Sequence, residues 1–135
     1  MLFRSKILSL LFCFLVFTVA SQAQTAFSHT ASNPTGAILN TSSDTMTYSM
    51  KKGYASVAIQ PVITRATGTM AGTSVLYYSV NGTNWVATGD TLTNTNTATN
   101  STIWAKTVPA RYWRIITSGA TTVTGTTAAK IIIGQ

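Results

Sequence analysis

Residues 54–64 alternate between two sets of side chains, and this pattern constrains the fold more than any other feature of the chain. Every second position carries an apolar residue that would share one side of a strand: Ala55, Val57, Ile59, Pro61 and Ile63. Successive side chains of a β-strand point to opposite faces, so the alternation predicts a strand with one buried face. No stretch after Gln24 keeps apolar residues at i, i+3, i+4 and i+7, so we predict no substantial helix.

Further strand candidates follow at short spacing and are rich in Thr, Val, Ile, Tyr and Trp: 46–50, 74–80, 103–107, 112–118, 121–124 and 128–133. Pro61 cannot donate a ladder hydrogen bond, so its strand should lie at an edge, carry a bulge or break there. Roughly eight short strands with turn signals between them predict an all-β fold. The expected architecture is a single antiparallel β-sandwich or jelly roll that covers 46–135.

Residues 1–23 have the features of an export signal. Arg4 and Lys6 precede an apolar run of about 14 residues, which is shorter than a membrane-spanning helix. Ser21-Gln22-Ala23 offers the small-x-small pattern that a signal peptidase cleaves. We therefore predict a cleaved signal peptide, no transmembrane anchor, and a secreted protein that works outside the cell or in the periplasm. Residues 24–45 should form an extended N-terminal segment with at most one short strand.

Cys13 is the only cysteine and lies within the predicted signal, so the mature domain would contain no disulfide. Its stability must then come from its core alone. Exported domains often use disulfides, so their absence favours a bacterial or phage-encoded product.

The charge is basic but dispersed. The whole chain carries a formal net charge of +7, and removal of Arg4 and Lys6 leaves +5. The remaining cations are scattered along the chain: Lys51, Lys52, Arg65, Lys106, Arg111, Arg114 and Lys130. A dedicated nucleic-acid binder would show a dense basic stripe, so we predict no nucleic-acid partner. The charge fits either solubility or weak attraction to an anionic surface such as a membrane or an acidic polysaccharide.

Two motifs carry a resemblance to a known family. Asn81-Gly82 lies between two β-rich runs and predicts a tight hairpin with a type I′ turn. The segment Ser79 to Trp85 resembles the Ser-x-Asp-Gly-x-x-Trp hairpin of discoidin and other galactose-binding-like β-sandwich modules, with Asn81 in place of Asp. Ala110 to Ile115 resembles the Ala-Arg-Tyr-x-Arg-Ile strand that follows this hairpin in the same modules. Similar hairpins occur in phage virion surface proteins. The resemblance implies a β-sandwich, and it implies no binding residue, because both motifs belong to the scaffold of that family.

The tryptophans could either pack in the core or contact a ligand. Aromatic rings can stack on sugar rings, but a disulfide-free domain also needs the area that they bury. We expect Trp85 and Trp113 to lie in the core. Tyr77 and Tyr78 are adjacent in a strand and must point to opposite faces, so only one of them can share the buried face. The exposed tyrosine and Trp104 are therefore the predicted ligand-binding residues.

The Thr/Asn-rich tract at 90–100 has two interpretations. It is either a long exposed loop or an edge strand whose polar side chains form ladders, and tracts of this composition with low charge can pair between chains.

Catalytic groups are scarce. Asp44 and Asp90 are the only acids, there is no glutamate, and His29 is the only histidine. Paired carboxylates would have to converge from distant segments, and no nucleophile motif accompanies the histidine. We predict no enzyme activity, no cofactor and no metal site built from clustered side chains, while a calcium ion held by backbone carbonyls and one Asp stays an open alternative.

Two functions remain. The first is a non-enzymatic interaction or structural module, displayed on a cell or virion surface, that binds a glycan or a surface protein. The second is a self-assembling subunit, a homo-oligomer that builds an extracellular fibre, coat or matrix.

Overall fold

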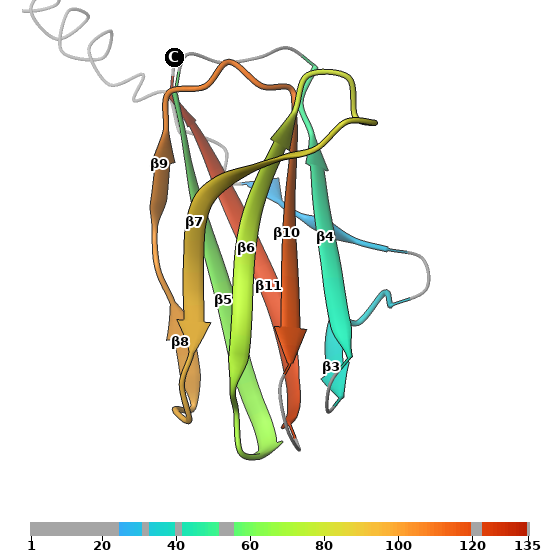
Figure 1. The fold of residues 1–135 in the computed structure, drawn as a ribbon, viewed down its shortest axis with the longest axis vertical. Helices are drawn as coiled ribbons and strands as arrows, with labels where there is room; N and C mark the ends of the chain where they lie inside the picture. Colours follow the sequence, from blue (N-terminus) through green and yellow to red (C-terminus); the bar gives the residue numbers. More distant parts are fainter. Residues whose placement is uncertain (1–24, 31–32, 40–41, 52–55, 120–122, 135) are drawn as a thin grey trace, which may run out of the picture.

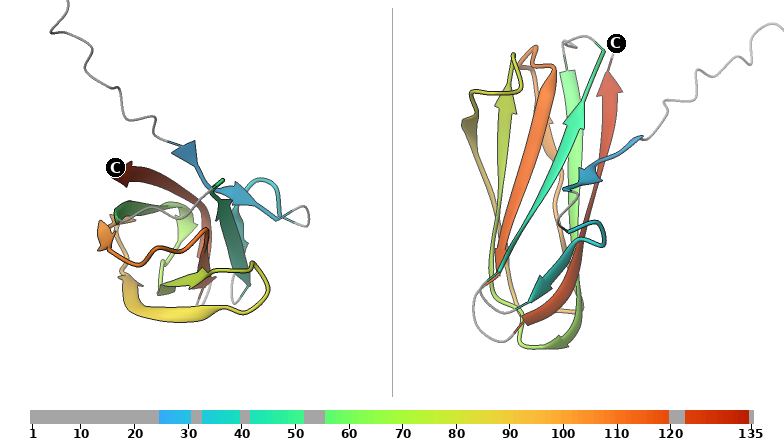
Figure 2. Two further views of the ribbon diagram at one scale, coloured as in Figure 1. Left: turned by 90° about the horizontal axis from the view of Figure 1, so that it is seen from above. Right: turned by 90° about the vertical axis from the view of Figure 1, so that its right-hand side faces the viewer.

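The computed structural model describes residues 25–30, 33–39, 42–51, 56–119 and 123–134. The predicted signal peptide lies outside the described residues. All regular elements within them are β-strands, and they form two antiparallel sheets that face each other. Figure 2 shows the two layers from above and from the side. The predicted all-β, antiparallel sandwich is therefore confirmed.

The first sheet, here called sheet A, is built around a long antiparallel pair. Its strands are β1 (Thr25–Ala26), β3 (Ala37–Leu39), β5 (Ser56–Gly68), β8 (Thr99–Ser101), β9 (Trp104–Lys106) and β11 (Val123–Gly134). β11 pairs with β5 along almost its whole length, from Gly134 opposite Ser56 to Val123 opposite Gly68. The predicted strands at 121–124 and 128–133 thus contribute to one continuous strand as far as the described residues extend.

The second sheet, sheet B, has the order β2-β4-β10-β6-β7. Its strands are β2 (Ser28–His29), β4 (Ser43–Ser49), β6 (Gly72–Ser79), β7 (Val86–Asn94) and β10 (Tyr112–Gly119). β10 lies at the centre and pairs with both β4 and β6 (Figure 1). The residues from Tyr112 to Ser118 of β10 therefore have a ladder partner on each side.

Pro61 lies inside β5 without interrupting it. On one side, β5 pairs with β9 through Val57 to Ile59 and with β8 through Val62 to Thr64, so this side has no partner strand at Pro61. β5 neither breaks at Pro61 nor forms the edge of sheet A, so these two alternatives are wrong, and the neighbouring edge strand is divided instead. A register irregularity does occur in the pairing of β5 with β11, but it lies between Arg65 and Thr67, beyond the proline. The missing N–H of proline explains why the division falls at this position.

Apolar side chains from both sheets fill the space between them. They come from alternate positions of the strands: Met46, Leu76, Trp113 and Ile115 in sheet B, and Val57, Ile59, Trp104, Ala129 and Ile131 in sheet A. Trp113 is 0% exposed, as expected for a core residue. A second, smaller cluster of Ile38, Ile63 and Met70 fills the lower end. The alternation predicted for residues 54–64 matches the observed burial of Val57, Ile59 and Ile63.

The segment predicted as an extended lead contains three short strands, β1, β2 and β3, where at most one was expected. β1 pairs with β11 and β2 with β4, so the segment is joined to both sheets. Polar contacts also hold its first part to the start of β4, because Asn33 donates to Asp44 Oδ1 at 2.8 Å and His29 Nδ1 lies 3.2 Å from Asp44 Oδ2. Strands of two or three residues are too short for alternation to reveal.

The Thr/Asn-rich tract is not a long exposed loop. Its first residues complete β7, its last residues belong to β8, and a short turn at 95–98 joins the two sheets. Among the described strands, β7 pairs with β6 alone and β8 with β5 alone, which agrees with the edge-strand interpretation. Asn100 is buried and its Oδ1 accepts hydrogen bonds from the Thr95 N–H and hydroxyl, each at 3.0 Å. The side-chain amide of Asn100 therefore stabilises the turn at 95–98, which the composition of the tract did not reveal.

Candidate functional site

The outer face of sheet B carries a cluster of two rings and a guanidinium near the upper end of β10. Trp113 and Ile115 point into the core, so Arg114 between them points outward. The residue opposite Arg114 on β6 is Tyr77, and opposite residues of an antiparallel pair share a face. The third member, Trp85, comes from the loop that joins β6 to β7. We call Tyr77, Trp85 and Arg114 the outer stack.

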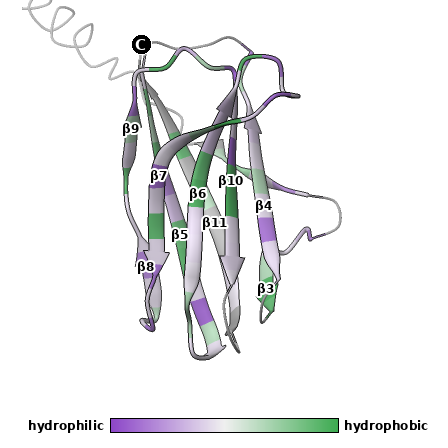
Figure 3. Cartoon of the chain, in the orientation of Figure 1, coloured by the Kyte–Doolittle hydropathy of each residue, from purple (hydrophilic) through white to green (hydrophobic). Residues whose placement is uncertain are grey.

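The loop that supplies Trp85 is longer than predicted. The pairing of β6 with β7 ends at Tyr78 opposite Val86, so residues 79–85 form the connection. The hairpin is confirmed, but the two-residue type I′ turn is wrong. In Figure 1 the loop leaves the upper end of β6, extends over the upper ends of β10 and β4, and returns in front of the sheet to β7. Figure 3 shows hydrophilic residues at its tip and, in β10, a hydrophilic position near the upper end with hydrophobic positions below it.

Short polar side chains fix the shape of this loop. Asn81 Oδ1 accepts hydrogen bonds from the backbone N–H of Thr83 and of Asn84, each at 2.9 Å. Ser79 Oγ accepts from the Gly82 N–H at 2.9 Å and donates to Asn81 Oδ1 at 3.0 Å. These bonds satisfy backbone donors inside the loop, as in an Asx-turn. Trp85 is therefore held at the end of an ordered segment.

The guanidinium of Arg114 lies against both rings of the outer stack. Its central carbon is 4.3 Å from the Trp85 ring centroid and 5.3 Å from the Tyr77 ring centroid, which are cation–π distances. Arg114 Nε is buried and has no hydrogen-bond partner among the described residues. The stack is held by ring contacts and not by hydrogen bonds.

Further basic groups border the outer stack at the upper end of sheet B. Gly82 has a φ of 76°, and an added Cβ would lie 3.4 Å from the Tyr112 ring, so the loop rests on this ring. The exposed Arg111 has its guanidinium carbon 5.6 Å from the Tyr112 centroid. Its carbonyl accepts the Met50 N–H at 2.8 Å, which brings exposed Lys51 beside it in the backbone. We call Lys51 and Arg111 the basic rim.

Both carboxylate side chains of the protein lie elsewhere. The Asp44 side chain is 0% exposed and interacts with His29 and Asn33. Asp90 forms an ion pair with Lys106, with 2.5 Å between Oδ2 and Nζ, which links β7 to β9 across one side of the sandwich. Neither acid therefore neutralises the arginines of the outer face.

The pKa of Asp90 is shifted by its surroundings. Partial burial raises the pKa of its carboxyl, but the ammonium of Lys106 and the hydroxyl of Thr88 lower it by more. The net pKa therefore lies below its ordinary value, and the carboxylate form is favoured.

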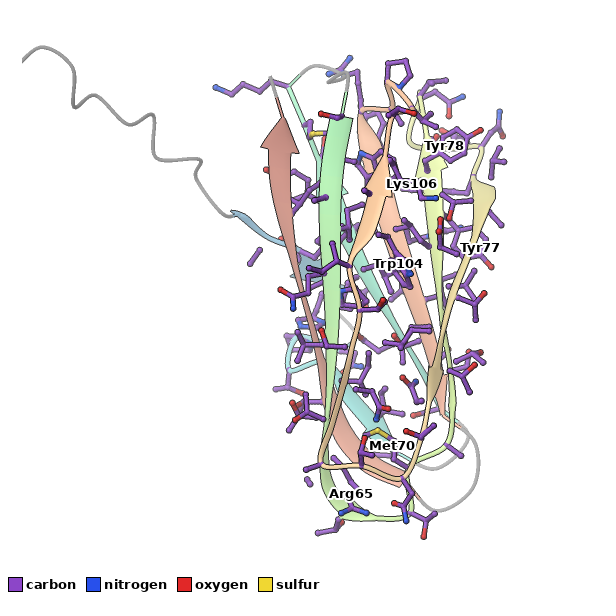
Figure 4. All side chains as sticks on the ribbon, turned by 90° about the vertical axis from the view of Figure 1, so that its left-hand side faces the viewer. Arg65, Met70, Tyr77, Tyr78, Trp104 and Lys106 are labelled. Carbon is purple, nitrogen blue, oxygen red and sulfur yellow. The ribbon has the colours of Figure 1, made fainter. Side chains whose placement is uncertain are left out.

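The structure separates the three predicted ligand-binding residues. Trp104 is 7% exposed and belongs to the core, because β9 pairs in register with β5 and turns this residue inward beside Ile59. The expectation that Trp104 is exposed is wrong. Tyr78 also faces inward, with its ring centroid 6.2 Å from that of Trp113. In Figure 4, Trp104 lies between β9 and the facing sheet, below Lys106 on the same strand.

Tyr77 alone of the predicted set lies on the outer face, as alternation requires. Trp85, which we expected in the core, is half-buried over Arg114 instead. Within the described ranges, no group of three or more His, Cys, Asp or Glu side chains lies close enough to hold a metal ion. The same residues include no helix long and apolar enough to cross a bilayer.

The chain matches no protein-family model and no curated protein sequence. Solved structures of similar fold include the PBSX exported protein XepA, with 11% sequence identity and a TM-score of 0.56, over 83% of this chain and 37% of XepA. The Yersinia pseudotuberculosis-derived mitogen has 10% identity and a TM-score of 0.49 over 84% of this chain and 86% of its own. A family 35 carbohydrate-binding module from Clostridium thermocellum has 9% identity and a TM-score of 0.48, over 83% and 99%. The likeness to XepA concerns the fold alone, and the two facing sheets confirm the β-sandwich implied by the two motifs.

Arg114 was missed by sequence reasoning although a signal was present. A charged residue between Trp113 and Ile115 must point away from the core when both neighbours point inward. The contact with Trp85 could not be foreseen, because it depends on the path of the loop across the sheet.

Proposed function

We propose that this protein is an exported, non-enzymatic β-sandwich module of a cell or virion surface that binds glycans on the outer face of sheet B. The observation that carries the proposal is the position of Trp85, a half-buried ring on the surface that lies 4.3 Å from the Arg114 guanidinium. A pyranose ring has an apolar face of C–H groups that can pack on such a flat aromatic surface.

The surroundings of Trp85 support a binding role. Val80 and Val86, at the two ends of the loop, are 67% and 52% exposed, and Val86 directly follows Trp85, so the loop presents further apolar surface to solvent. Because the loop is fixed by the hydrogen bonds of Ser79 and Asn81, little order has to be gained when a ligand binds. An aromatic anchor on an ordered segment is typical of residues that dominate binding.

A glycan array followed by calorimetry on the mature protein tests this proposal. We expect weak but measurable binding of a glycan by the wild type. Trp85→Ala should raise the Kd for this glycan at least about tenfold. Trp85→Leu keeps an apolar side chain against Arg114 but removes the flat ring, and it should weaken binding by a similar factor. Circular dichroism and thermal unfolding check that both variants fold.

Ile103→Ala is the matched control, because Ile103 is 67% exposed beside sheet A, away from the outer stack. Its affinity should equal that of the wild type. The proposal fails if no glycan binds, or if loss of Trp85 leaves affinity unchanged in a folded protein.

Self-assembly is a second candidate, supported by the free edge of β7. This Thr-rich strand pairs with β6 alone among the described strands. Two features of β7 oppose strand addition: an irregular register opposite Val75 to Tyr77, and the charge of Asp90. Analytical ultracentrifugation over a hundredfold range of concentration tests the point. A monomer throughout removes this candidate, and a discrete oligomer or fibre that Asp90→Val strengthens would establish it.

A further inference from the structure

We infer that the glycan recognised by the outer stack is acidic, a sugar that carries a carboxylate or a sulfate group, and that Arg111 and Arg114 bind this anion. The inference rests on the proposed function, because it names the ligand class of the same face. Its basis is the state of the two guanidinium groups and the absence of a side-chain carboxylate beside them.

Arg114 keeps hydrogen-bond donors that the described residues do not use. A guanidinium has five N–H donors, and the contacts of Arg114 are with the faces of Trp85 and Tyr77, which accept no conventional hydrogen bond. Its Nε is already buried without a partner. A carboxylate or a sulfate oxygen beside the stack would supply the missing acceptors through strong, charge-assisted bonds.

Arg111 places a second guanidinium at the same end of sheet B. Tyr112 and Arg114 point to the same face and are two positions apart, which corresponds to about 7 Å along a strand. Arg111 lies over the Tyr112 ring, and exposed Lys51 follows the residue that bonds the Arg111 carbonyl. A sugar that packs on Trp85 would therefore lie within about one or two sugar units of Arg111 and Lys51.

No acid offsets this charge. The sequence contains two acidic residues, and Asp44 is buried against His29 while Asp90 is paired with Lys106. The outer stack and the basic rim therefore present a positive potential with no carboxylate side chain to reduce it.

The pattern of charge and rings favours an acidic sugar over other anionic partners. Nucleic acid is normally bound by a row of cations that follows successive phosphates, whereas this surface has a compact group of three. A membrane surface is normally bound by a larger apolar face or a polybasic cluster. One ring beside a few guanidinium groups matches the size of a sugar unit with one charged substituent.

Two pairs of polysaccharides test the inference on the mature protein. Polygalacturonate and its methyl ester share a backbone but differ in the carboxylate, and dextran sulfate and dextran differ in the sulfate. We expect one charged member to bind about tenfold more tightly than its neutral counterpart, a difference of about 1.4 kcal/mol. This preference should shrink between 50 and 500 mM NaCl, as screening predicts.

Arg111→Gln should reduce affinity for the charged polymer about fivefold and affinity for a neutral glycan by a smaller factor, while Arg111→Lys should restore part of the loss for the charged polymer. Arg65→Gln removes the same charge at the opposite end and should change affinity less than twofold.

Each result decides a different question. Equal binding of the charged and neutral polymers overturns the inference and leaves the proposed function intact. Binding of no polysaccharide overturns both. Equal losses in Arg111→Gln and Arg65→Gln would mean unspecific attraction and overturn the inference. Tighter binding of single-stranded DNA or of phosphatidylserine vesicles, with the same dependence on Arg111, would also overturn it.

Discussion

Arg65 and Arg114 lie toward opposite ends of the sandwich, and their guanidinium groups have different surroundings. Arg65, at the lower end in Figure 4, donates to Asn96 Oδ1 at 2.5 Å and to the Gly68 carbonyl at 3.5 Å. Arg114 lies against Trp85 and Tyr77 instead. The lower end thus uses its cation to close a turn, whereas the upper end leaves donors that a ligand can use.

At the lower end, Asn96 and Asn100 bind the chain itself, although Oδ1 of the neighbouring buried Asn94 has no hydrogen-bond partner among the described residues. Asn96 Oδ1 also accepts the Met70 N–H at 3.1 Å, and Asn100 Nδ2 donates to the Thr95 carbonyl at 2.9 Å and lies 3.1 Å from Met70 Sδ. Asparagine here replaces backbone partners that a regular strand would provide. The two ends therefore differ in whether the guanidinium donors are used within the chain: Nη1 of Arg65 is bonded, whereas Nε of Arg114 is not.

The largest expected effect is a loss of stability in Asn100→Ala, a substitution at the lower end that should leave binding at the upper end unchanged. Asn100→Ala removes a buried amide that bonds the N–H, the hydroxyl and the carbonyl of Thr95, and each such hydrogen bond contributes about 0.5–1.5 kcal/mol. We expect the free energy of unfolding to fall by about 2 kcal/mol in urea titrations. Glycan affinity should stay the same at a temperature where the variant is folded. A loss of affinity without a loss of stability would contradict the division between the two ends.

A smaller effect is expected at the upper end from Ser79→Ala. The hydroxyl of the buried Ser79 accepts the Gly82 N–H and donates to Asn81, and both bonds are only partly buried, so stability should fall by about 1 kcal/mol. Affinity should fall several-fold, because the loop that carries Trp85 loses its fixed shape. Thr83→Ala is the control, because only the Thr83 backbone N–H takes part in the loop bonds with Asn81. A Ser79→Ala variant with wild-type affinity would show that loop order does not matter for binding.

The Asp90–Lys106 ion pair lies at neither end of the sandwich and is expected to make a small, pH-dependent contribution to stability. The folded pKa of Asp90 is lowered, so its contribution to stability is present above the unfolded pKa of about 3.9 and is lost as the pH falls through the folded pKa. Asp90→Asn should lower stability at pH 7 by about 0.5 kcal/mol, a small value because solvent reaches the pair. The difference between variant and wild type, followed by urea unfolding, should begin to shrink below about pH 4 and disappear once the pH is below the folded pKa of Asp90. A difference that persists in acid would point to packing and not to charge.

The smallest effect is expected from Arg65→Lys. An ammonium can still reach Asn96 Oδ1 or the Gly68 carbonyl but lacks the planar shape of a guanidinium. The free energy of unfolding, measured by urea titration, should therefore change by less than about 0.5 kcal/mol. A larger loss would mean that the lower turn depends on the guanidinium itself.

The sequence predicted the layers of the fold because alternation reports burial directly. Val57, Ile59 and Ile63 in β5, and Trp113 and Ile115 in β10, follow that rule. The alternation rule failed to predict β1 and β2, which are too short to show it, and β7, whose threonines and asparagines have the composition of a loop. Trp104 was misplaced because its inward orientation depends on the register with β5. The outer stack was missed for a similar reason, since the path of the loop decides where Trp85 lies.

The division of the edge strand opposite Pro61 has a practical consequence. Thr102 and Ile103 separate β8 from β9, lie outside the ladder, and include a side chain that is 67% exposed. Insertions are best tolerated where the backbone makes no ladder bonds and the chain is open to solvent. A peptide tag placed here would immobilise the protein on a sensor through sheet A and leave the opposite layer open to the sample.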